Sequence, residues 1–407
     1  MRIDGFRSLG GTHGETAALT NLLAWAGHRN PFTGKALREA EVFGIAGGIG
    51  AGLSFCPSIP RYGLGGGVGV VGRHRAYSFD GSYQRAVLDR LGIEAAVQES
   101  STPKAGTKKL AGDLVEGRPV LVWCARLLPW FGGPSFCSSC SVFGHNLVVF
   151  GLDEDVGEVE VADLPGAALR LAADALAKAR GAICTHKNRQ LTIEPAGKAL
   201  TKTAVEAAVR AGLDACITDL REPRIKTFGL PGLERFARQV ANTKAKDGWP
   251  RFFADGKLYW PLKDCFATIE TEGTGGGLMR PLFASFLDAA AKVLGKPGLK
   301  QVAKTYRRLG KRWTALAEAA LPSEVPAFAR TKALLRERNA LLAEGGADAL
   351  AEVARLATEL DRLQRKELAR FPLDEADRMA LLEGLSRDIT ALHRAECAAL
   401  DELAATS

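Results

Sequence analysis

The first apolar pattern in the chain predicts a helix that follows a short glycine-rich segment. Apolar residues recur at helical spacing within residues 12–29, and Gly27 follows the last of them, as is typical of a helix end. A second helix is expected over residues 34–43. Five glycines then fall within residues 44–52, a density that suits a backbone that turns sharply or approaches another segment closely. The apolar positions of the first helix are Leu19, Leu22, Leu23 and Trp25.

The middle of the chain carries the pattern of a β-sheet. Short runs rich in Val, Leu and Ile predict strands, and residues 153–157 have the composition of a hairpin turn between the last two of them. Helices therefore come first, helices and strands follow together, and an antiparallel sheet comes last, which is an α+β order and not an alternating βαβ one. The predicted strands cover residues 67–71, 119–123, 145–151 and 158–163.

Helical periods dominate after about residue 190. Thr203 is a plausible N-cap for a helix within residues 201–211. The last two segments are rich in Ala, Leu, Glu and Arg, with leucines three and four residues apart, so we expect them to pack as a helical hairpin. The helical segments of this part are 201–211, 230–240, 278–294, 349–371 and 374–405.

Composition narrows the class of protein. A chain of 407 residues is long enough for two or three domains, and 54 Lys and Arg against 46 Asp and Glu give a formal charge of +8 that suits anionic partners. No basic run is interleaved with aromatic residues, so we expect no nucleic-acid partner. No segment is apolar enough to span a bilayer, and eight scattered cysteines suggest reduced thiols, so we expect no membrane association and a cytoplasmic protein.

One histidine and one aspartate are the first candidates for chemistry. His145 directly follows a glycine at the start of an apolar strand, and Asp163 lies at the end of the next predicted strand. Neighbouring antiparallel strands can place a carboxylate beside an imidazole and fix its tautomer, as a base in a catalytic triad requires. A lone histidine in a strand is more often structural, and both readings stay open.

Other motifs carry weaker signals. The glycines of residues 44–52 follow a helix and not a strand, so close packing is favoured over a dinucleotide site. Residues 273–277 precede a predicted helix, where an anion site is conceivable. Cys137 and Cys140 have metal-ligand spacing but lack a second pair, so we expect no metal. Cys56 is a further candidate thiol because the glycine-rich segment beside it is expected near the cleft.

Taken together, these motifs resemble the N-terminal domain of the butirosin biosynthesis protein H family. The glycine-rich segment 275–280 and the phenylalanines after it resemble the second, uncharacterised domain of that family. The resemblance covers roughly residues 8–320, and residues beyond about 322 lie outside it. The motifs of the first domain are His13-x-x-Thr16-x-x-Leu19-x-Asn21-Leu22-Leu23, the glycine segment after Phe43, the strands 117–123 and 144–149, and Asp163 to Pro165.

The resemblance implies a papain-like fold and an acyltransferase that moves an aminoacyl group from a carrier-protein phosphopantetheine thioester to an amine. The family's histidine and aspartate map to His145 and Asp163, and its nucleophilic cysteine maps to Gly14. Since glycine cannot form an acyl-enzyme, three readings survive. In the first, the amine attacks the thioester directly, with His145 as base, Asp163 orienting it and backbone N–H groups of the first helix binding the oxyanion. In the second, a neighbour such as Cys56, Thr16 or Glu15 enters the chemistry. In the third, the protein is a catalytically inactive binding protein. A hydrolase is a lesser alternative.

We therefore predict an α+β chain with a papain-like domain over residues 1–195, a mostly helical second domain over 196–321 and a helical extension over 322–407. The extension is expected to mediate homodimerisation, cap the cleft or recruit the carrier. No intrinsic cofactor is expected beyond the phosphopantetheine thioester of an acyl carrier protein, and the acceptor is a small amine. Predicted catalytic residues are His145, Asp163, Glu15 and Cys56, and predicted substrate-binding residues are His13, Gly14, Thr16, Gly48, Gly50 and Asn146.

Overall fold

The computed structural model describes residues 1–56, 67–75, 81–125, 145–183, 186–254 and 256–407. Two compact units are present, and each is assembled from separated segments of the chain. The sheet unit comprises residues 1–46, 77–211 and 340–355, and the helical unit comprises residues 47–76, 212–339 and 356–407. The predicted boundaries at residues 195 and 321 stay predictions.

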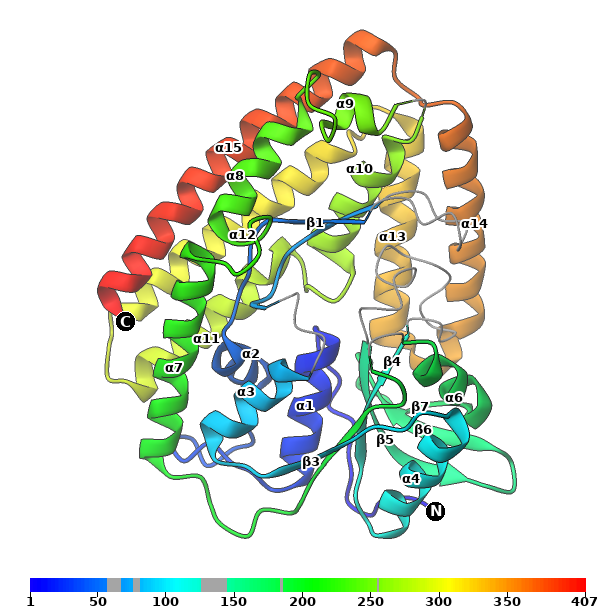
Figure 1. Cartoon of the computed structure of the whole chain (residues 1–407), viewed down its shortest axis with the longest axis vertical. Coiled ribbons are helices and arrows are strands. Elements are labelled where there is room, and N and C mark those ends of the chain that lie inside the picture. Colours follow the sequence, from blue (N-terminus) through cyan, green and yellow to red (C-terminus); the bar gives the residue numbers. More distant parts are fainter. Residues whose placement is uncertain (57–66, 76–80, 126–144, 184–185, 255) are drawn as a thin grey trace. The chain divides into compact units, whose positions relative to one another are not determined.

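The sheet unit is built on a six-stranded antiparallel sheet (Figure 1). Its two central strands, β4 and β5, are buried along almost their whole length. Because alternate side chains of a strand point to opposite faces, this burial means that both faces of the sheet are covered. The strand order is β3 (Ala95–Gln98), β8 (Gln190–Ile193), β4 (Val120–Cys124), β5 (His145–Asp153), β6 (Glu158–Ala162) and β7 (Leu169–Ala172).

Helix α1 (Gly14–Trp25) packs on β5. The prediction of a first helix within residues 12–29 is therefore confirmed. The second helix, α2 (Glu39–Ala46), begins later than predicted. The side chain of Asn30 accepts the N–H of Phe32, and the backbone carbonyl oxygen of Asn30 accepts the N–H of Gly34. Gly34 itself lies in the left-handed region, with φ of 68°. These bonds form a turn that delays the helix. The sheet unit also contains α3 (Ser82–Leu91), α4 (Pro103–Val115) and α6 (Ala173–Gly181).

The helical unit contains one short antiparallel pair of strands, β1 (Leu53–Cys56) and β2 (Gly67–Val70), among long helices. Helix α15 packs along both α8 and α12, and α12 also packs along α11 (Figure 1). The last segment therefore packs against α8 and α12, and the hairpin expected between it and residues 349–371 is not among the closely packed helix pairs of the described residues. The helices are α8 (Gly229–Val240), α9 (Trp249–Phe252), α10 (Tyr259–Phe266), α11 (Arg280–Val293), α12 (Leu299–Ala320) and α15 (Glu375–Thr406).

Among the described helices, three contribute residues to both units: α7 (Lys202–Arg221), α13 (Pro326–Gly345) and α14 (Leu350–Ala369). The expected N-cap of α7 is wrong by two residues. Thr201 and not Thr203 accepts a backbone N–H at the helix start, that of Ala204 at 3.1 Å. Within the described ranges, no helix combines the length and the apolar character needed to cross a membrane.

Candidate functional site

The segment before α1 is fixed against the end of β6 by close backbone contact. The N–H of Gly11 donates to the Leu164 carbonyl oxygen at 2.9 Å. A side-chain carbon at Gly10 would lie only 2.8 Å from that same oxygen, and the φ of Gly10 is 65°, so the approach requires glycine. On the other side, the Asn21 side chain accepts the N–H of Leu9 at 2.7 Å and so ties the segment to α1.

The predicted histidine and aspartate form a buried pair. Nε2 of His145, on β5, lies 2.6 Å from Oδ1 of Asp163, and the two side chains are only 8% and 1% exposed. The N–H of Leu164 donates to the same carboxylate oxygen at 2.8 Å. Because a carboxylate only accepts hydrogen bonds, the neutral imidazole carries its proton on Nε2, and Nδ1 is its basic nitrogen.

The basic edge of His145 faces Gly14. A side-chain carbon built at Gly14 would lie 2.4 Å from Cε1 and 2.7 Å from Nδ1 of the imidazole. Both distances are well inside van der Waals contact, so the ring occupies space that any larger residue at position 14 would need. The geometry brings Nδ1 of His145 to the position where the resemblance places a nucleophile, and the residue there is glycine.

Three further predicted residues lie at the start of the same helix. Oγ1 of Thr16 is 2.6 Å from Nδ1 of His13 and 2.9 Å from the Tyr83 hydroxyl. Nε2 of His13 is 3.5 Å from Oε2 of Glu15. The sheet unit therefore brings together six of the predicted site residues: His13, Gly14, Glu15, Thr16, His145 and Asp163.

Glu39 is a site residue that the sequence did not reveal. Its carboxylate, at the first position of α2, accepts the N–H of Thr12 at 2.9 Å and that of His13 at 2.7 Å. Burial raises the pKa of this carboxyl above its usual range, while the two backbone donors oppose that shift. Of the N–H groups expected to bind an oxyanion, these two are already engaged. The N–H of Gly14 has no acceptor in the part of the chain that the structure describes.

Asn146 lies beside the histidine, but its amide is used within the protein. Its Oδ1 accepts the Gln84 side chain at 2.8 Å, and its Nδ2 donates to the Val122 carbonyl oxygen at 3.2 Å. The residue is fully buried. These bonds give Asn146 a structural role between β4, β5 and α3, and its predicted contact with substrate stays a prediction.

The remaining predicted site residues belong to the helical unit. The N–H of Gly50 donates to the Gly72 carbonyl oxygen, and a side-chain carbon at Gly50 would lie 2.3 Å from the Arg73 carbonyl oxygen. Gly48 accepts the N–H of His74, and the backbone of Cys56 pairs with Gly67 at the end of β1. These contacts agree with the close-packing reading of the glycine segment, and the roles of Gly48, Gly50 and Cys56 in the site stay predictions.

The glycine-rich segment 273–277 does not leave its helix end open to an outside anion. The N–H of Gly277 donates to Oε1 of Glu270 at 3.0 Å, and Thr314 donates to the same oxygen at 2.8 Å. A carboxylate of the protein thus takes the place suggested for a bound anion. Cys137 and Cys140 lie outside the described residues, and within those residues no cluster of His, Cys, Asp or Glu could hold a metal ion.

The fold and the site define a mixed α/β protein with an imidazole–carboxylate pair at the start of a buried helix. Residues 13–164 match the family model described as butirosin biosynthesis protein H, N-terminal, and residues 174–371 match a domain of unknown function, DUF4872. Together the two matches support the resemblance to the butirosin biosynthesis protein H family that the sequence motifs indicate. The second match ends at residue 371, so the resemblance extends further along the chain than the end near residue 320 that the sequence motifs indicated. No curated protein matches the chain.

Proposed function

We propose that this protein transfers an acyl or aminoacyl group from a phosphopantetheine thioester to an amine, on a papain-like scaffold that serves natural-product biosynthesis. The observation that carries the proposal is the orientation of His145. Its Nε2 is fixed by Asp163 at 2.6 Å, and its Nδ1 faces the Gly14 position. The match to the N-terminal part of butirosin biosynthesis protein H supports a biosynthetic role of this kind.

Without a nucleophile at position 14, the amine itself attacks the thioester. The nitrogen lone pair forms the C–N bond, Nδ1 of His145 takes a proton from that nitrogen, and the C–S bond then breaks with its electron pair leaving on sulfur. Asp163 stabilises the imidazolium that forms and holds the ring in the correct tautomer. A thioester is already activated, so orientation and one base supply much of the necessary rate.

The developing oxyanion requires a donor that the protein does not already use. Thr12 and His13 donate their N–H groups to Glu39, so the N–H of Gly14 is the donor we assign to this role. It belongs to the first residue of α1, where N–H groups lack partners within the helix and the helix dipole favours negative charge.

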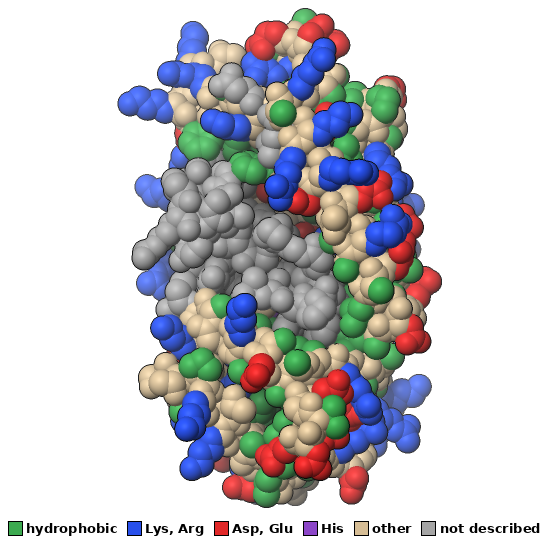
Figure 2. All heavy atoms as spheres, turned by 90° about the vertical axis from the view of Figure 1, so that its right-hand side faces the viewer, with side chains coloured by type: hydrophobic (Ala, Val, Ile, Leu, Met, Phe, Trp, Pro, Cys, Tyr) green, Lys and Arg blue, Asp and Glu red, His purple; other side chains and the backbone are tan. Residues whose placement is uncertain are grey.

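The proposed donor is an acyl carrier protein, and the proposed acceptor is a small amine. The formal charge of +8 suits an acidic carrier, and both basic and acidic side chains occur on the face shown in Figure 2. The phosphopantetheine of the carrier is the only cofactor in the proposal. A cytoplasmic location and a homodimer through residues 322–407 belong to the same proposal.

The experiment combines intact-protein mass spectrometry with detection of released thiol. The protein is mixed with acyl-pantetheine thioesters with and without candidate amines. We expect thiol release that depends on the amine and leaves no acyl adduct on the protein. A stable adduct that maps to Cys56 or Thr16 would contradict direct attack by the amine and would show that a relocated nucleophile takes the acyl group first. His145→Ala should lose this release of thiol. His393→Gln, which removes a histidine of the helical unit, serves as the control and should keep it.

A second candidate function is binding without catalysis. The observation that favours it is the imidazole itself, since its ring fills the space that a side chain at position 14 would occupy. In that case the protein holds a carrier protein or a product. Absence of both thiol release and adduct across the panel, together with saturable binding of a carrier protein, would establish this alternative.

A further inference from the structure

A second imidazole in the sheet unit is part of a chain of hydrogen bonds. Nδ1 of His13 lies 2.6 Å from Oγ1 of Thr16, and that oxygen lies 2.9 Å from the Tyr83 hydroxyl. Thr16 is fully buried and Tyr83 is nearly so. Since His13 directly precedes Gly14, this chain lies at the same helix start as the His145–Asp163 pair.

Acidic groups from its own helix and from α2 contact His13. Oε2 of Glu15 lies 3.5 Å from Nε2, and Glu39 accepts the backbone N–H of His13 at 2.7 Å. The ring meets Phe43 and Tyr83 edge-on. The contact at Nδ1 is short enough to hold the ring in place, and the contact at Nε2 is longer.

Both charge states of His13 are satisfied by this arrangement. In the neutral ring, the Glu15 carboxylate favours a proton on Nε2, so Thr16 donates to Nδ1 and Tyr83 donates to Thr16. In the imidazolium, Nδ1 donates to Thr16, and the hydroxyl turns to donate to Tyr83. Rotation of two O–H bonds is therefore enough to accommodate a proton gained or lost at the ring.

His28 shows the opposite arrangement in the same unit. It is buried, and neither ring nitrogen has a hydrogen-bond partner among the described residues. Burial lowers the pKa of His28 because nothing compensates the charged form. His13 differs from His28 in its contacts, because Thr16 lies at hydrogen-bond distance from its Nδ1 and Glu15 lies near its Nε2.

We propose that His13 is the second acid–base group of the Gly14 site, with Thr16 and Tyr83 as its positioning residues. This inference rests on the proposed acyl transfer and adds the fate of the leaving group. As the C–S bond breaks, the departing thiolate takes the proton from Nε2 of the His13 imidazolium. His145 holds the proton from the amine, and solvent then returns both imidazoles to their starting states, so amine and thioester yield amide and thiol.

Nuclear magnetic resonance of ring-labelled histidine in the full chain tests the relay apart from turnover. The chain has six histidines, and His13→Gln identifies the signal of interest. Hydrogen bonds to charged groups are stronger than those to neutral ones, so Thr16→Val should move the titration midpoint of His13 to lower pH by about one unit. Thr16→Ser keeps the hydroxyl and should titrate as wild type.

Thr20→Val is the matched control, because among the described residues the Thr20 hydroxyl donates to the Thr16 carbonyl oxygen, one turn along the same helix, and not to the Thr16 side chain. A midpoint in Thr16→Val equal to that in Thr20→Val would overturn the relay. In the thiol-release assay, His13→Gln should lose about 100-fold in rate and lose the limb of the pH profile at higher pH.

An active wild type beside an equally active His13→Gln with an unchanged pH profile would overturn the assignment of His13 while leaving the proposed function intact. An inactive wild type would instead refute the proposed function and the thiolate protonation step with it. In that case the titration of Thr16→Val still decides whether the hydroxyl relay controls the charge of His13.

Discussion

At the scale of single residues, Gly14 determines how much space the His145 ring has at the start of α1. A glycine carries no nucleophile, and its lack of a side chain makes room for the His145 ring. Its role therefore involves space as well as chemistry. A substitution that adds only a methyl group separates the two, because it restores no nucleophile but competes for the space.

Gly14→Ala should lower amine-dependent thiol release by about 100-fold, because the new methyl displaces the His145 ring and misplaces its base. The assay is the rate of thiol release at fixed thioester and amine. Gly112→Ala is the control, since a side-chain carbon there meets nothing within 4 Å on helix α4. Equal rates in the two variants would show that the position of His145 is irrelevant to turnover.

The sequence predicted His145 and Asp163 as partners because consecutive hairpin strands place their ends side by side. The motif at residues 13–16 was also found, since it is contiguous. Glu39 and Tyr83 were not predicted, because they reach the site only through folding and carry no local pattern. The sequence likewise gave no sign that the N–H groups of Thr12 and His13 are already occupied by Glu39.

At the scale of elements, the start of α1 depends on a side chain of α2. Glu39→Ala should lower the free energy of unfolding by about 1–3 kcal/mol, because it leaves the N–H groups of Thr12 and His13 without their acceptor. Urea unfolding measures the change. Glu94→Ala, at an exposed position of the same unit, should stay within about 0.5 kcal/mol of wild type. Matching losses in both variants would contradict the capping role.

In the helical unit, a buried carboxyl on α10 makes stability depend on pH. Burial raises the pKa of Asp264 to about 6, although Lys263 opposes the shift. A raised folded-state pKa favours the protonated native form, so this contribution is complete below the unfolded pKa near 3.8 and is lost as pH rises through about 6.

Asp264→Asn should therefore gain stability relative to wild type as pH rises from 4 to 7, by roughly 3 kcal/mol at most. The amide keeps an oxygen for the Val68 N–H, which Asp264 accepts at 3.3 Å. Urea midpoints across this pH range provide the measurement, with exposed Asp388→Asn as control. A difference between Asp264→Asn and wild type that stays constant with pH would refute the assignment.

Long periodic helices and the strands at residues 145–151 and 158–163 were predicted well, because burial on regular faces leaves a regular apolar pattern. Strands β1, β3, β7 and β8 were missed. Each has only four residues, and such short runs carry too few alternations to stand out from their surroundings.

At the scale of the whole molecule, one buried arginine connects three distant parts of the chain. Arg280 donates to Glu396 of α15 at 2.8 Å, to the Gly50 carbonyl oxygen at 2.9 Å and to the Leu278 carbonyl oxygen at 3.0 Å. All of these residues belong to the helical unit. Segment 47–76 and the C-terminal helix are thereby held in one unit, which no local sequence pattern could have revealed.

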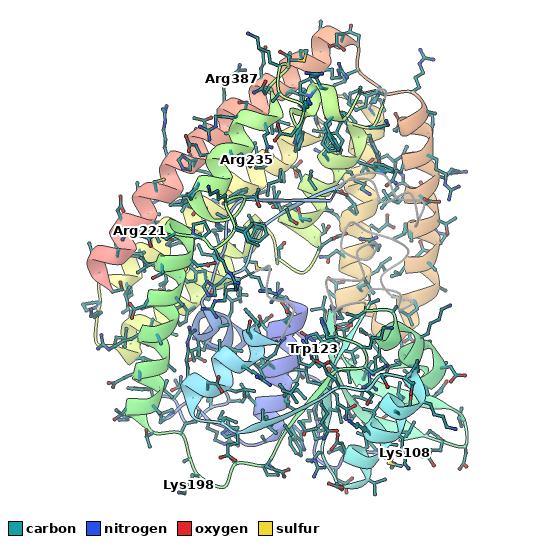
Figure 3. The ribbon with its side chains drawn as sticks, viewed as in Figure 1. Lys108, Trp123, Lys198, Arg221, Arg235 and Arg387 are labelled. Carbon is teal, nitrogen blue, oxygen red and sulfur yellow. The ribbon has the colours of Figure 1, made fainter. Side chains whose placement is uncertain are left out.

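Arg280→Met should lower the free energy of unfolding of this unit by about 3–5 kcal/mol, because it leaves the Glu396 carboxylate buried without its ion-pair partner. Arg221, labelled in Figure 3, pairs with Asp401, which lies on α15 like Glu396, but these two side chains are 45% and 73% exposed. Arg221→Met should therefore change stability by less than about 1 kcal/mol. Comparable losses in the two variants would contradict the central role of the buried pair.

The most direct measurement for the whole account compares amine-dependent thiol release by wild type and by His145→Ala on one acyl-pantetheine thioester. The account predicts release by the wild type without an acyl adduct, and a fall of about 10²–10⁴-fold in the variant, the range that a lost general base produces. Equal rates in the two proteins, or no amine-dependent release by the wild type, would contradict the claim that His145 acts as a base at the Gly14 position.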